Sequence, residues 1–447
     1  MIISVLGTGY VGLVSGVCLA EKGHYVICVD IDPDKVEITN RGVPIIHEAG
    51  LEDLLKKNIG NRFRATTDLR RAILESELSL IAVGTPFKGN EIDLSYIREV
   101  SRQIGMVLRD KPTYHVIVVK STVVPGTTQE VVLPTLENFS GKKAGADFGV
   151  GMNPEFLRES VAVEDFMFPD RIVLGGIDEK TLDTLEELYS VFDGVDKIRT
   201  TPKTAEMIKY TSNSLLATMI SFSNEIGNLC ASLGDIDVVD VMKAVHLDKR
   251  LCPFLPDGRR IVPQFTTYLE AGCGFGGSCF PKDVKALIAH GKRVGGDMSL
   301  LQAVLKVNED QPRQVVSLIK KEFPSLQGVP VAVLGLAFKP GTDDVRESPS
   351  ILIIQNLLDL GASIKAYDPV AMNEAKKILG TQRVEFCDDL YQAVSHVEAV
   401  VLITAWEAFR TLPEYLSGLN PQPLVIDGRR MLNKTSIARY RGIGMRE

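Results

Sequence analysis

Short, wholly apolar segments recur through the first ~200 residues and are separated by longer segments of mixed polarity. The apolar segments are rich in Val and Ile, as strands covered on both faces are. They are Ile2–Leu6, Tyr25–Asp30, Leu78–Val83, Val116–Val119, Phe148–Gly151 and Arg171–Leu174. Strands that alternate with helices predict a mostly parallel, doubly wound α/β sheet.

A different pattern begins at Lys203. From there to Leu233 the chain has no proline and only Gly227 as a glycine. Apolar residues recur near helical spacing, at Ile208, Leu215, Met219, Phe222, Ile226 and Leu229. This pattern predicts one helix of roughly 45 Å, which typically crosses between domains or packs against a copy of itself. The segment Leu251–Gly272 contains Pro253, Pro256 and Pro263 and predicts a loop.

Strand and helix alternation returns from Val329 onward. A helix is predicted over Ser348–Leu360, between strands at Val331–Leu334, Ser363–Tyr367, Val400–Thr404 and Leu424–Ile426. This block is a degenerate repeat of the N-terminal one. It lacks a triple-glycine turn, so we do not expect it to hold a second dinucleotide in the usual way.

Composition and charge exclude several classes of function. The chain has 447 residues, 45% hydrophobic and 24% charged, which predicts two or three globular domains. A net charge of −7, without a long basic run, argues against nucleic acid or an anionic membrane as partner. No apolar run approaches the ~18–20 residues of a bilayer span. The first strand already starts at Ile2, so no signal peptide is expected.

The seven cysteines include no C-x-x-C pair, which argues against a zinc site or a redox dithiol, so no metal is expected. Cys18 and Cys28 lie inside apolar segments and are interpreted as small core residues. This usage fits a reducing cytosol, and we predict a cytoplasmic protein.

Gly7, Gly9 and Gly12 form a G-x-G-x-x-G pattern directly after the first strand, and a helix follows from Tyr10. Such glycines allow a tight turn, close approach of a pyrophosphate and close helix–strand packing. Asp30 ends the second strand roughly 20 residues further on, where a carboxylate binds a ribose 2′-hydroxyl and repels a 2′-phosphate. The pattern therefore predicts NAD as the cofactor, in preference to NADP.

Two later strands end in small hydroxyl residues. Val83–Pro86 contains Thr85, and Ser121–Gly126 contains Thr122. Because ligands lie at the carboxyl ends of strands in a doubly wound sheet, these turns are candidates to complete the cofactor site. Each is also common as a purely structural turn.

The segment Gly274–Asp283 places a cysteine after a glycine-rich turn and at the predicted start of a helix. Pro281 suits the first helical turn. A thiol at a helix N-terminus is expected to have a lowered pKa and to react as a thiolate. Asp283 lies one turn after Cys279 on the same face. A hydride acceptor and a nucleophilic thiol predict an oxidation through a covalent thioester; the alternative is a buried structural cysteine.

The chain resembles the nucleotide-sugar 6-dehydrogenases, the UDP-glucose/GDP-mannose dehydrogenase family. The resemblance covers nearly the whole chain in the family's order. It rests on the N-terminal glycine turn with Asp30, and on Ser121–Gly126, Asn153–Glu159, Glu206–Asn213, Gly274–Asp283 and Phe338–Ser348.

Members of this family oxidise the C6 alcohol of a sugar nucleotide to a carboxylate with two NAD molecules. The resemblance implies two Rossmann-like domains joined by a long central helix that mediates a homodimer. It also implies an NAD-binding domain over residues 1–200, a central helical domain with Cys279 over 201–300, and a nucleotide-sugar-binding domain over 301–447.

The resemblance implies a role for each site residue. Cys279 is the nucleophile, and Lys209 and Asn213 support the C6 oxygen. Asp283 and Thr122 position a water, with Asp283 as base either directly or through that water. Glu159 assists thioester hydrolysis; the alternative for Glu159 and Glu155 is a structural cap or pair. The expected cofactor residues are Gly7, Gly9, Tyr10, Val11, Gly12, Asp30, Lys35, Thr85, Thr122, Glu159 and Arg346. The expected substrate residues are Glu155, Phe156, Leu157, Lys209, Asn213, Arg250, Phe275, Gly276, Lys282 and Lys339. Without the resemblance, Lys209 and Asn213 are ordinary helix-surface residues, and Lys339 and Arg346 ordinary surface charges.

The chain departs from the family pattern in one place. The loop between Arg250 and Gly274 is longer than usual, so Arg250, Arg259 and Arg260 all remain candidates to contact the nucleotide. UDP-glucose is the leading substrate. GDP-mannose is the nearest rival, since the segment from Ser140 to Glu159 is similar to that branch, and a UDP-N-acetylhexosamine follows. A two-electron hydroxyacid-type dehydrogenase and a non-catalytic nucleotide sensor are the alternative classes.

Overall fold

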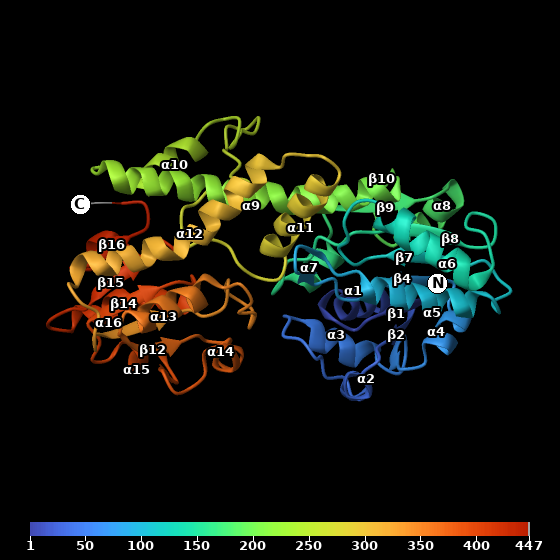
Figure 1. Ribbon diagram of the computed structural model, residues 1–447, viewed down its shortest axis with the longest axis horizontal. Coiled ribbons are helices and arrows are strands. Elements are labelled where there is room, and N and C mark those ends of the chain that lie inside the picture. Colours follow the sequence, from blue (N-terminus) through green and yellow to red (C-terminus); the bar gives the residue numbers. More distant parts are fainter. Residues whose placement is uncertain (446–447) are drawn as a thin grey trace. The chain divides into compact units, whose positions relative to one another are not determined.

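The computed structural model describes residues 1–445 and divides into two compact units, Met1–Ser212 and Asn213–Glu447 (Figure 1). The division falls inside the long helix α9, Pro202–Leu233. Within residues 1–445, no helix has both the length and the apolar character needed to cross a bilayer. The predicted division into three domains stays a prediction.

The first unit is built on a mixed sheet of eight strands. Their order is β10 (Asp196–Thr200), β9 (Arg171–Gly176), β8 (Gly149–Met152), β7 (Val116–Val119), β4 (Leu78–Ile81), β1 (Ile2–Leu6), β2 (Tyr25–Val29) and β3 (Phe63–Thr66). The strands from β3 to β8 pair in parallel, and β9 pairs antiparallel with β8. From β1 the sheet continues to one side through β2 and β3 and to the other side through β4, β7 and β8. In doubly wound sheets ligands bind at such a reversal, which here lies at the carboxyl ends of β1 and β4.

Helices cover both faces of this sheet, because alternate strand residues point in opposite directions. Ile3 and Val5 pack with α1 (Tyr10–Glu21), α3 (Leu51–Asn58), α7 (Ala162–Met167) and α8 (Glu179–Leu188). Leu6 packs on the other face with α4 (Leu69–Glu75), α5 (Ser95–Leu108) and α6 (Leu133–Ser140). The remaining elements are α2 (Pro33–Asn40), the hairpin β5 (Phe87–Lys88) and β6 (Glu91–Ile92), and the π-helical turn η1 (Thr128–Val132).

Helix α9 begins one residue before its predicted start and ends where predicted, since Pro202 fits the first turn and Gly234 follows its end. Its exposure pattern departs from that of an ordinary amphipathic helix along one stripe. Leu215, Phe222 and Leu229 are 59%, 51% and 53% exposed, whereas the small polar Ser223 and Asn224 are buried. One stripe of the helix therefore carries exposed large apolar residues, while Tyr210 is fully buried and Met219 and Ile226 pack against the core.

The second unit contains the remainder of α9 and four further helical elements before its sheet. These are α10 (Val238–His246), the 3₁₀ turn η2 (Gln264–Tyr268), α11 (Phe280–Arg293) and α12 (Ser299–Glu322). The turn η2 lies in the segment predicted as a loop.

The sheet of the second unit has six parallel strands. Their order is β13 (Val384–Phe386), β12 (Ser363–Tyr367), β11 (Pro330–Leu334), β14 (Ala399–Leu402), β15 (Leu424–Asp427) and β16 (Tyr440–Gly442). Its helical elements are α13 (Pro349–Asp359), α14 (Met372–Leu379), α15 (Leu390–Val394), α16 (Leu412–Ser417), η3 (Glu407–Thr411) and η4 (Lys434–Ser436). The strand order repeats that of β3 to β8 in the first unit, in agreement with the degenerate repeat read from the sequence.

The repeat differs where a ribose would bind. Asp368 follows β12 as Asp30 follows β2, but it is buried and its carboxylate accepts the N–H groups of Leu336 and Ala337 at 2.7 and 3.1 Å. The indole Nε1 of Trp406 donates to the same oxygen at 3.0 Å. Asp368 therefore closes the turn after β11 with its own side chain.

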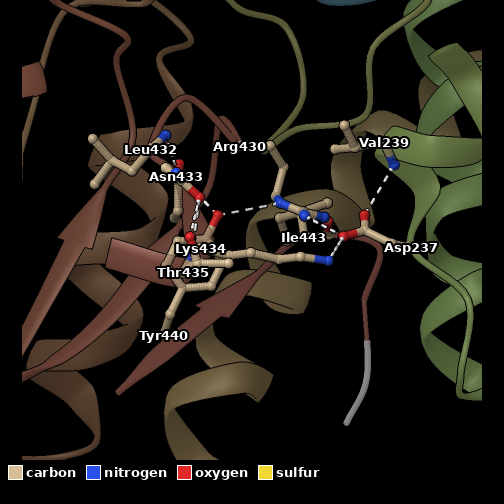
Figure 2. Close-up of polar contacts among 10 residues, drawn as sticks. Asp237, Val239, Arg430, Leu432, Asn433, Lys434, Thr435, Tyr440 and Ile443 are labelled. Carbon is tan, nitrogen blue, oxygen red and sulfur yellow. Dashed lines mark hydrogen bonds and ion pairs between the residues drawn. The ribbon is translucent and has the colours of Figure 1, made fainter. Parts of the chain in front are cut away.

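A buried ion pair ties α10 to the end of the chain (Figure 2). Asp237 caps α10 by accepting the Val239 N–H, and its carboxylate pairs with Arg430 at 2.8 Å and Lys434 at 2.9 Å. The Arg430 guanidinium also donates to the Ile443 carbonyl. Burial by itself raises the pKa of Asp237, but the hydrogen bonds from both cations outweigh burial and hold it well below the usual range.

Candidate active site

The glycine turn after β1 has the geometry of a phosphate cradle. Gly7 has a φ of +103°, and a Cβ on it would lie 2.7 Å from the Ala82 carbonyl oxygen. A Cβ on Gly12 would lie 1.9 Å from the Gly7 carbonyl oxygen, so both positions exclude side chains. Gly9, which caps α1, faces open space instead. The N-terminus of α1, with Tyr10 and Val11 in its first turn, is thus accessible to a pyrophosphate, and the turn fits a dinucleotide.

Asp30 lies beside this turn at the end of β2. Its Oδ2 accepts the Thr8 N–H at 3.0 Å, and its Oδ1 accepts the Asp32 N–H at 3.1 Å. Burial acts to raise the pKa of Asp30, but the Thr8 and Asp32 hydrogen bonds and the nearby Lys35 charge prevail and lower it. The group is therefore an ionised acceptor, as a ribose-binding carboxylate must be.

The turns after β4 and β7 are joined side by side. The Thr85 hydroxyl donates to the Thr122 carbonyl at 2.7 Å, and the Ser121 hydroxyl donates to the Val83 carbonyl at 2.7 Å. Strands β4 and β7 are adjacent and parallel, so their carboxyl ends meet at one edge of the sheet. The hydroxyl residues singled out in the sequence therefore lock the two turns to each other.

A cluster around Glu48 holds the segment that contains Glu159. The buried Glu48 carboxylate accepts the N–H groups of Ser160 at 2.9 Å and Ala162 at 2.8 Å, and it accepts the Tyr10 hydroxyl. Burial, together with the charges of Glu48 and Glu159, raises the pKa of Tyr10. The Glu159 carboxylate thus lies near the first turn of α1. Sequence analysis missed Glu48, because a lone Glu before α3 has no motif around it.

Lys209 and Glu155 form a buried ion pair. The Lys209 Nζ lies 2.8 Å from Glu155 Oε1, and the two side chains are only 4% and 6% exposed. Burial opposes ionisation of Glu155, but the charge and hydrogen bond of Lys209 lower its pKa. The Lys209 ammonium also lies 5.6 Å from the centre of the Phe156 ring. A residue that could pass for a surface lysine in the sequence is therefore an interior cation with a fixed partner.

A second buried lysine lies in the same region. Lys120 donates to Asn153 Oδ1 at 2.8 Å, and burial lowers its pKa to about 8. The charge of Glu155 acts to raise this pKa and that of Lys209 to lower it, so the three groups share one buried charge cluster. Sequence analysis missed Lys120, which at the end of β7 has no signal beyond its place before Ser121.

In the second unit, Cys279 caps α11, with Pro281 in the first turn as predicted. The Asp283 N–H donates to the Cys279 carbonyl at 2.8 Å, and the Ser278 hydroxyl lies 3.5 Å from the Cys279 sulfur. Six of the seven cysteines are buried, and Cys279 alone is partly exposed. The residue chosen from the sequence is therefore the cysteine that a reagent or substrate can reach.

Asp283 is buried one turn along α11, and two side chains contact it. Asn213 Nδ2 donates to Asp283 Oδ2 at 2.6 Å, and Lys282 Nζ lies 2.5 Å from Asp283 Oδ1. Asn213 follows Lys209 by one turn on α9, so the two predicted supports of an oxygen share a helix face. Lys282 is directed toward Asp283, and its predicted contact with substrate stays a prediction.

The glycine turn before Cys279 packs against the segment Phe338–Glu347. A Cβ on Gly276 would lie 2.3 Å from the Glu347 carbonyl oxygen. The Gly277 N–H donates to the Arg346 carbonyl at 2.8 Å, and Gly277 has a φ of +82°. Residues about 70 positions apart in the sequence are thereby in backbone contact.

Three charged residues of the predicted set have neighbours in their own segments. Arg346 makes a bidentate pair with Asp344 at 2.8 and 2.7 Å. Lys339 lies 5.9 Å from the centre of the Phe338 ring. Arg250 pairs with Asp248 at the surface. Their predicted contacts with NAD and substrate stay predictions, as does the choice among Arg250, Arg259 and Arg260.

Asn308 of α12 is a further residue that sequence analysis missed. Its Oδ1 accepts the Phe275 N–H at 2.7 Å, and its Nδ2 donates to the Phe275 carbonyl at 3.0 Å. This amide clamp fixes the backbone at the entry to the Cys279 turn. Nothing in the helical pattern of α12 distinguishes Asn308 from a surface asparagine.

Three profiles of one family match successive parts of the chain. The profile described as "UDP-glucose/GDP-mannose dehydrogenase family, NAD binding domain" matches residues 1–193. The profile of the same family's central domain matches residues 203–310, and that of its UDP binding domain matches residues 332–434.

Full-length relatives agree. The UDP-glucose 6-dehydrogenase AglM of Haloferax volcanii is 40% identical over 97% of this chain and 98% of its own length. A GDP-mannose 6-dehydrogenase of Pseudomonas syringae pv. syringae is 44% identical over 82% of this chain and 81% of its own. The structure of a UDP-glucose dehydrogenase from Pyrobaculum islandicum superimposes with a TM-score of 0.89 at 40% identity, covering 99% of this chain and 98% of its own.

These matches confirm the resemblance read from the sequence, the Rossmann-like fold class and NAD as the cofactor. The chain belongs to the UDP-glucose/GDP-mannose dehydrogenase family and is an NAD-dependent nucleotide-sugar 6-dehydrogenase.

Proposed function

We propose that the protein oxidises UDP-glucose to UDP-glucuronate, in a four-electron reaction at C6 that passes through a thioester on Cys279. The observation that carries the mechanism is Cys279 itself, the one partly exposed cysteine, at the N-terminus of α11 and one turn from the buried Asn213–Asp283 hydrogen bond. The relatives and the Pyrobaculum structure named for UDP-glucose support the substrate.

In this proposal NAD is held by Gly7, Gly9, Gly12 and Asp30. Its site is completed by Tyr10, Val11, Lys35, Thr85, Thr122 and Arg346. When bound, NAD⁺ supplies the oxidant, since each of two molecules accepts one hydride from C6. The protein's own side chains bind the sugar, hold the aldehyde and position the water.

The Cys279 thiolate captures the half-oxidised sugar. Its sulfur adds to the aldehyde carbon, and the aldehyde oxygen takes up a proton to give a thiohemiacetal. After the second oxidation, which also removes the hydroxyl proton, the adduct is a thioester. Water then attacks the thioester carbonyl, the carbon–sulfur bond breaks, and the thiolate returns with the release of the acid and a proton. Covalent capture thus divides one difficult oxidation into easier steps and retains the aldehyde.

Lys209 and Asn213 stabilise negative charge on the C6 oxygen, and each lowers the activation barrier by about 2–4 kcal/mol. The ion pair with Glu155 keeps the Lys209 ammonium in position within the interior. A buried cation with a fixed partner needs little reorganisation when charge develops beside it.

Asp283 and Thr122 position the water that accepts the alcohol proton, and Glu159 assists the hydrolysis. The nucleotide sugar is bound by an arginine of the 250–260 loop together with Glu155, Phe156, Leu157, Phe275, Gly276, Lys282 and Lys339. GDP-mannose is the second candidate substrate, because relatives named for it are equally similar in sequence over a shorter span.

The proposal includes a cytosolic homodimer built on α9. The exposed apolar stripe of Leu215, Phe222 and Leu229 supports the dimer, because a large apolar surface at seven-residue spacing suits a second helix. Seven free cysteines support a reducing compartment.

A panel of purified nucleotide sugars tests the substrate. We expect UDP-glucose to give the highest kcat/KM and two NADH per sugar consumed, measured by absorbance and by chromatography of the acid. One NADH per sugar would refute the four-electron reaction, and preference for GDP-mannose would transfer the assignment to the second candidate.

Replacement of the thiol tests the mechanism. We expect Cys279→Ser to abolish release of the acid, since the alcohol is a far poorer nucleophile and leaving group. Cys273→Ser, at a buried cysteine nearby in sequence, is the matched control and should retain turnover. Unimpaired turnover by Cys279→Ser would favour a two-electron dehydrogenase. Tight binding of sugar nucleotides without NAD reduction by the unmodified enzyme would favour the sensor.

A further inference from the structure

Glu206 is a fully buried carboxylate in the first turns of α9 that the mechanism above does not use. Its Oε2 accepts the Gly126 N–H at 2.5 Å, and its Oε1 accepts the Thr128 N–H at 2.7 Å and the Thr128 hydroxyl at 2.6 Å. Three donors from one short turn therefore converge on a single side chain of another element. Such a contact is far more specific than packing alone, because both oxygens are occupied in fixed directions.

The turn held by Glu206 is the one that contains Thr122. At its start, the Ser121 hydroxyl is bonded to the Val83 carbonyl, and the Thr122 carbonyl accepts the Thr85 hydroxyl. At its end, Gly126 has a φ of +99° and is bonded to Glu206. Thr122 lies between these two anchors, so its position depends on both.

The same helix anchors the neighbouring turn. Lys209 follows Glu206 by about one turn of α9 and pairs with Glu155 in the segment after β8. Strands β7 and β8 are adjacent and parallel, so their carboxyl ends meet at one edge of the sheet. The first turns of α9 thus hold both of these catalytic segments through buried charges.

We propose that Glu206 is a positioning residue of the dehydrogenase reaction, which acts by fixing the Ser121–Thr128 turn, and with it Thr122, to the helix that bears Lys209. This inference rests on the proposed role of Thr122. Glu206 does not touch substrate or cofactor. Its effect on the reaction is carried by the geometry of the turn.

Charged groups near Glu206 include one on η1 and, on its own helix, Lys203 and Lys209. The charge of Glu130 in η1 acts to raise the pKa of Glu206, and Glu130 in turn pairs with Lys203 of α9 at 3.1 Å, at the surface. Burial raises the pKa of Glu206 to about 7, against the lowering effect of its hydrogen bonds. Protonation near neutral pH removes one acceptor site and loosens the turn, so activity should fall as the pH drops through 7.

A double-mutant cycle tests the inference in the full-length enzyme. We expect Glu206→Gln to lower kcat about tenfold with little change in the KM of the sugar nucleotide, because the amide replaces one acceptor by a donor facing an N–H. If Glu206 acts through Thr122, the Glu206→Gln/Thr122→Ala enzyme should be about as slow as the slower single variant. Independent sites would instead multiply their losses to about 100-fold if each costs tenfold.

The pH dependence of kcat distinguishes a positioning role of Glu206 from a purely structural one. The acid limb of kcat near pH 7 should disappear in Glu206→Gln. Glu130→Gln, a surface variant expected to fold normally, removes a negative charge that raises the pKa of Glu206, so its acid limb should move to lower pH at unchanged maximal kcat.

The outcomes separate two failures. An unchanged kcat in Glu206→Gln, multiplicative losses in the cycle, or an acid limb that Glu130→Gln leaves in place would overturn the inference about Glu206. Full activity of Thr122→Ala would refute the proposed role of Thr122, and the inference with it. Absence of turnover by the unmodified enzyme with every nucleotide sugar would refute the proposed function itself.

Discussion

At the scale of single residues, the site depends on positions where a side chain is excluded. Gly276 allows the Cys279 turn to contact the backbone of Glu347, because even a methyl group would overlap the carbonyl there. Gly12 likewise allows α1 to start against the turn after β1. These contacts between main-chain atoms cannot be relieved by a change of rotamer, so the tolerance for substitution is small.

We expect Gly276→Ala to lower kcat at least about 100-fold, because separating the two segments moves the Cys279 turn by ångströms and misaligned groups lose rate steeply. Turnover and the urea midpoint are the measurements. Gly418→Ala is the matched control, since the nearest atom to its added Cβ lies 3.8 Å away. Retained turnover by Gly276→Ala would show that the two segments need not touch.

At the scale of elements, the ends of the second unit are joined by charge as well as by packing. Asp237 at the start of α10 bonds two cations from the segment before β16, and these differ in their surroundings. The Arg430 side chain is 7% exposed and Lys434 is 46% exposed. The Asp237 carboxylate therefore forms one ion pair in the interior, with Arg430, and one at the surface, with Lys434 (Figure 2).

We expect Arg430→Met to destabilise the protein by about 3 kcal/mol, because removal of one partner from a buried pair leaves the other desolvated. Lys434→Met should cost less than about 1 kcal/mol, as exposed pairs do. Urea unfolding of the two variants at pH 7 compares them directly. Equal costs would mean that burial does not decide the strength of these bonds.

Predictions from pattern succeeded best for the strands that are apolar throughout and for α9, whose length leaves no other interpretation. The edge strands β3 and β10 were missed. Phe63–Thr66 and Asp196–Thr200 contain arginine, lysine and aspartate, because an edge strand is solvated on one side and loses its apolar signature. The turn η2 was also missed, since a 3₁₀ turn within a proline-rich segment has no periodicity to detect.

At the scale of the whole molecule, the unusual feature is the outward apolar face of α9. Ser223 and Asn224 take the buried positions instead, where Asn224 Oδ1 accepts the Gly272 N–H at 2.7 Å. An exposed row of Leu215, Phe222 and Leu229 favours association, because large exposed apolar patches are typical of interaction surfaces.

We expect Phe222→Glu to convert the proposed dimer to a monomer, because a charge in an apolar interface is desolvated without a partner. Light scattering should then give a mass near the 49.0 kDa of one chain. Ile378→Glu on α14 replaces an apolar residue of similar exposure, 50%, and should leave the mass unchanged. A monomeric unmodified protein would contradict the proposed interface.

The amino-acid sequence by itself determined the cofactor turn, the alternation of strands and helices and the long helix, and it singled out Cys279, the cysteine that is partly exposed. Each of these depends on local rules: glycine at a turn, hydrophobic period, and a thiol before a helix. The family could be identified from the same short segments, because they recur in a fixed order along the chain.

Only the tertiary structure decided which charges are buried and what they hold. No spacing rule connects the members of the pairs Glu206 with Gly126, Lys209 with Glu155, Asn213 with Asp283 and Asp237 with Arg430. The physical reason is that a charge enters the interior only where folding supplies its partner, and the partner comes from a distant part of the chain.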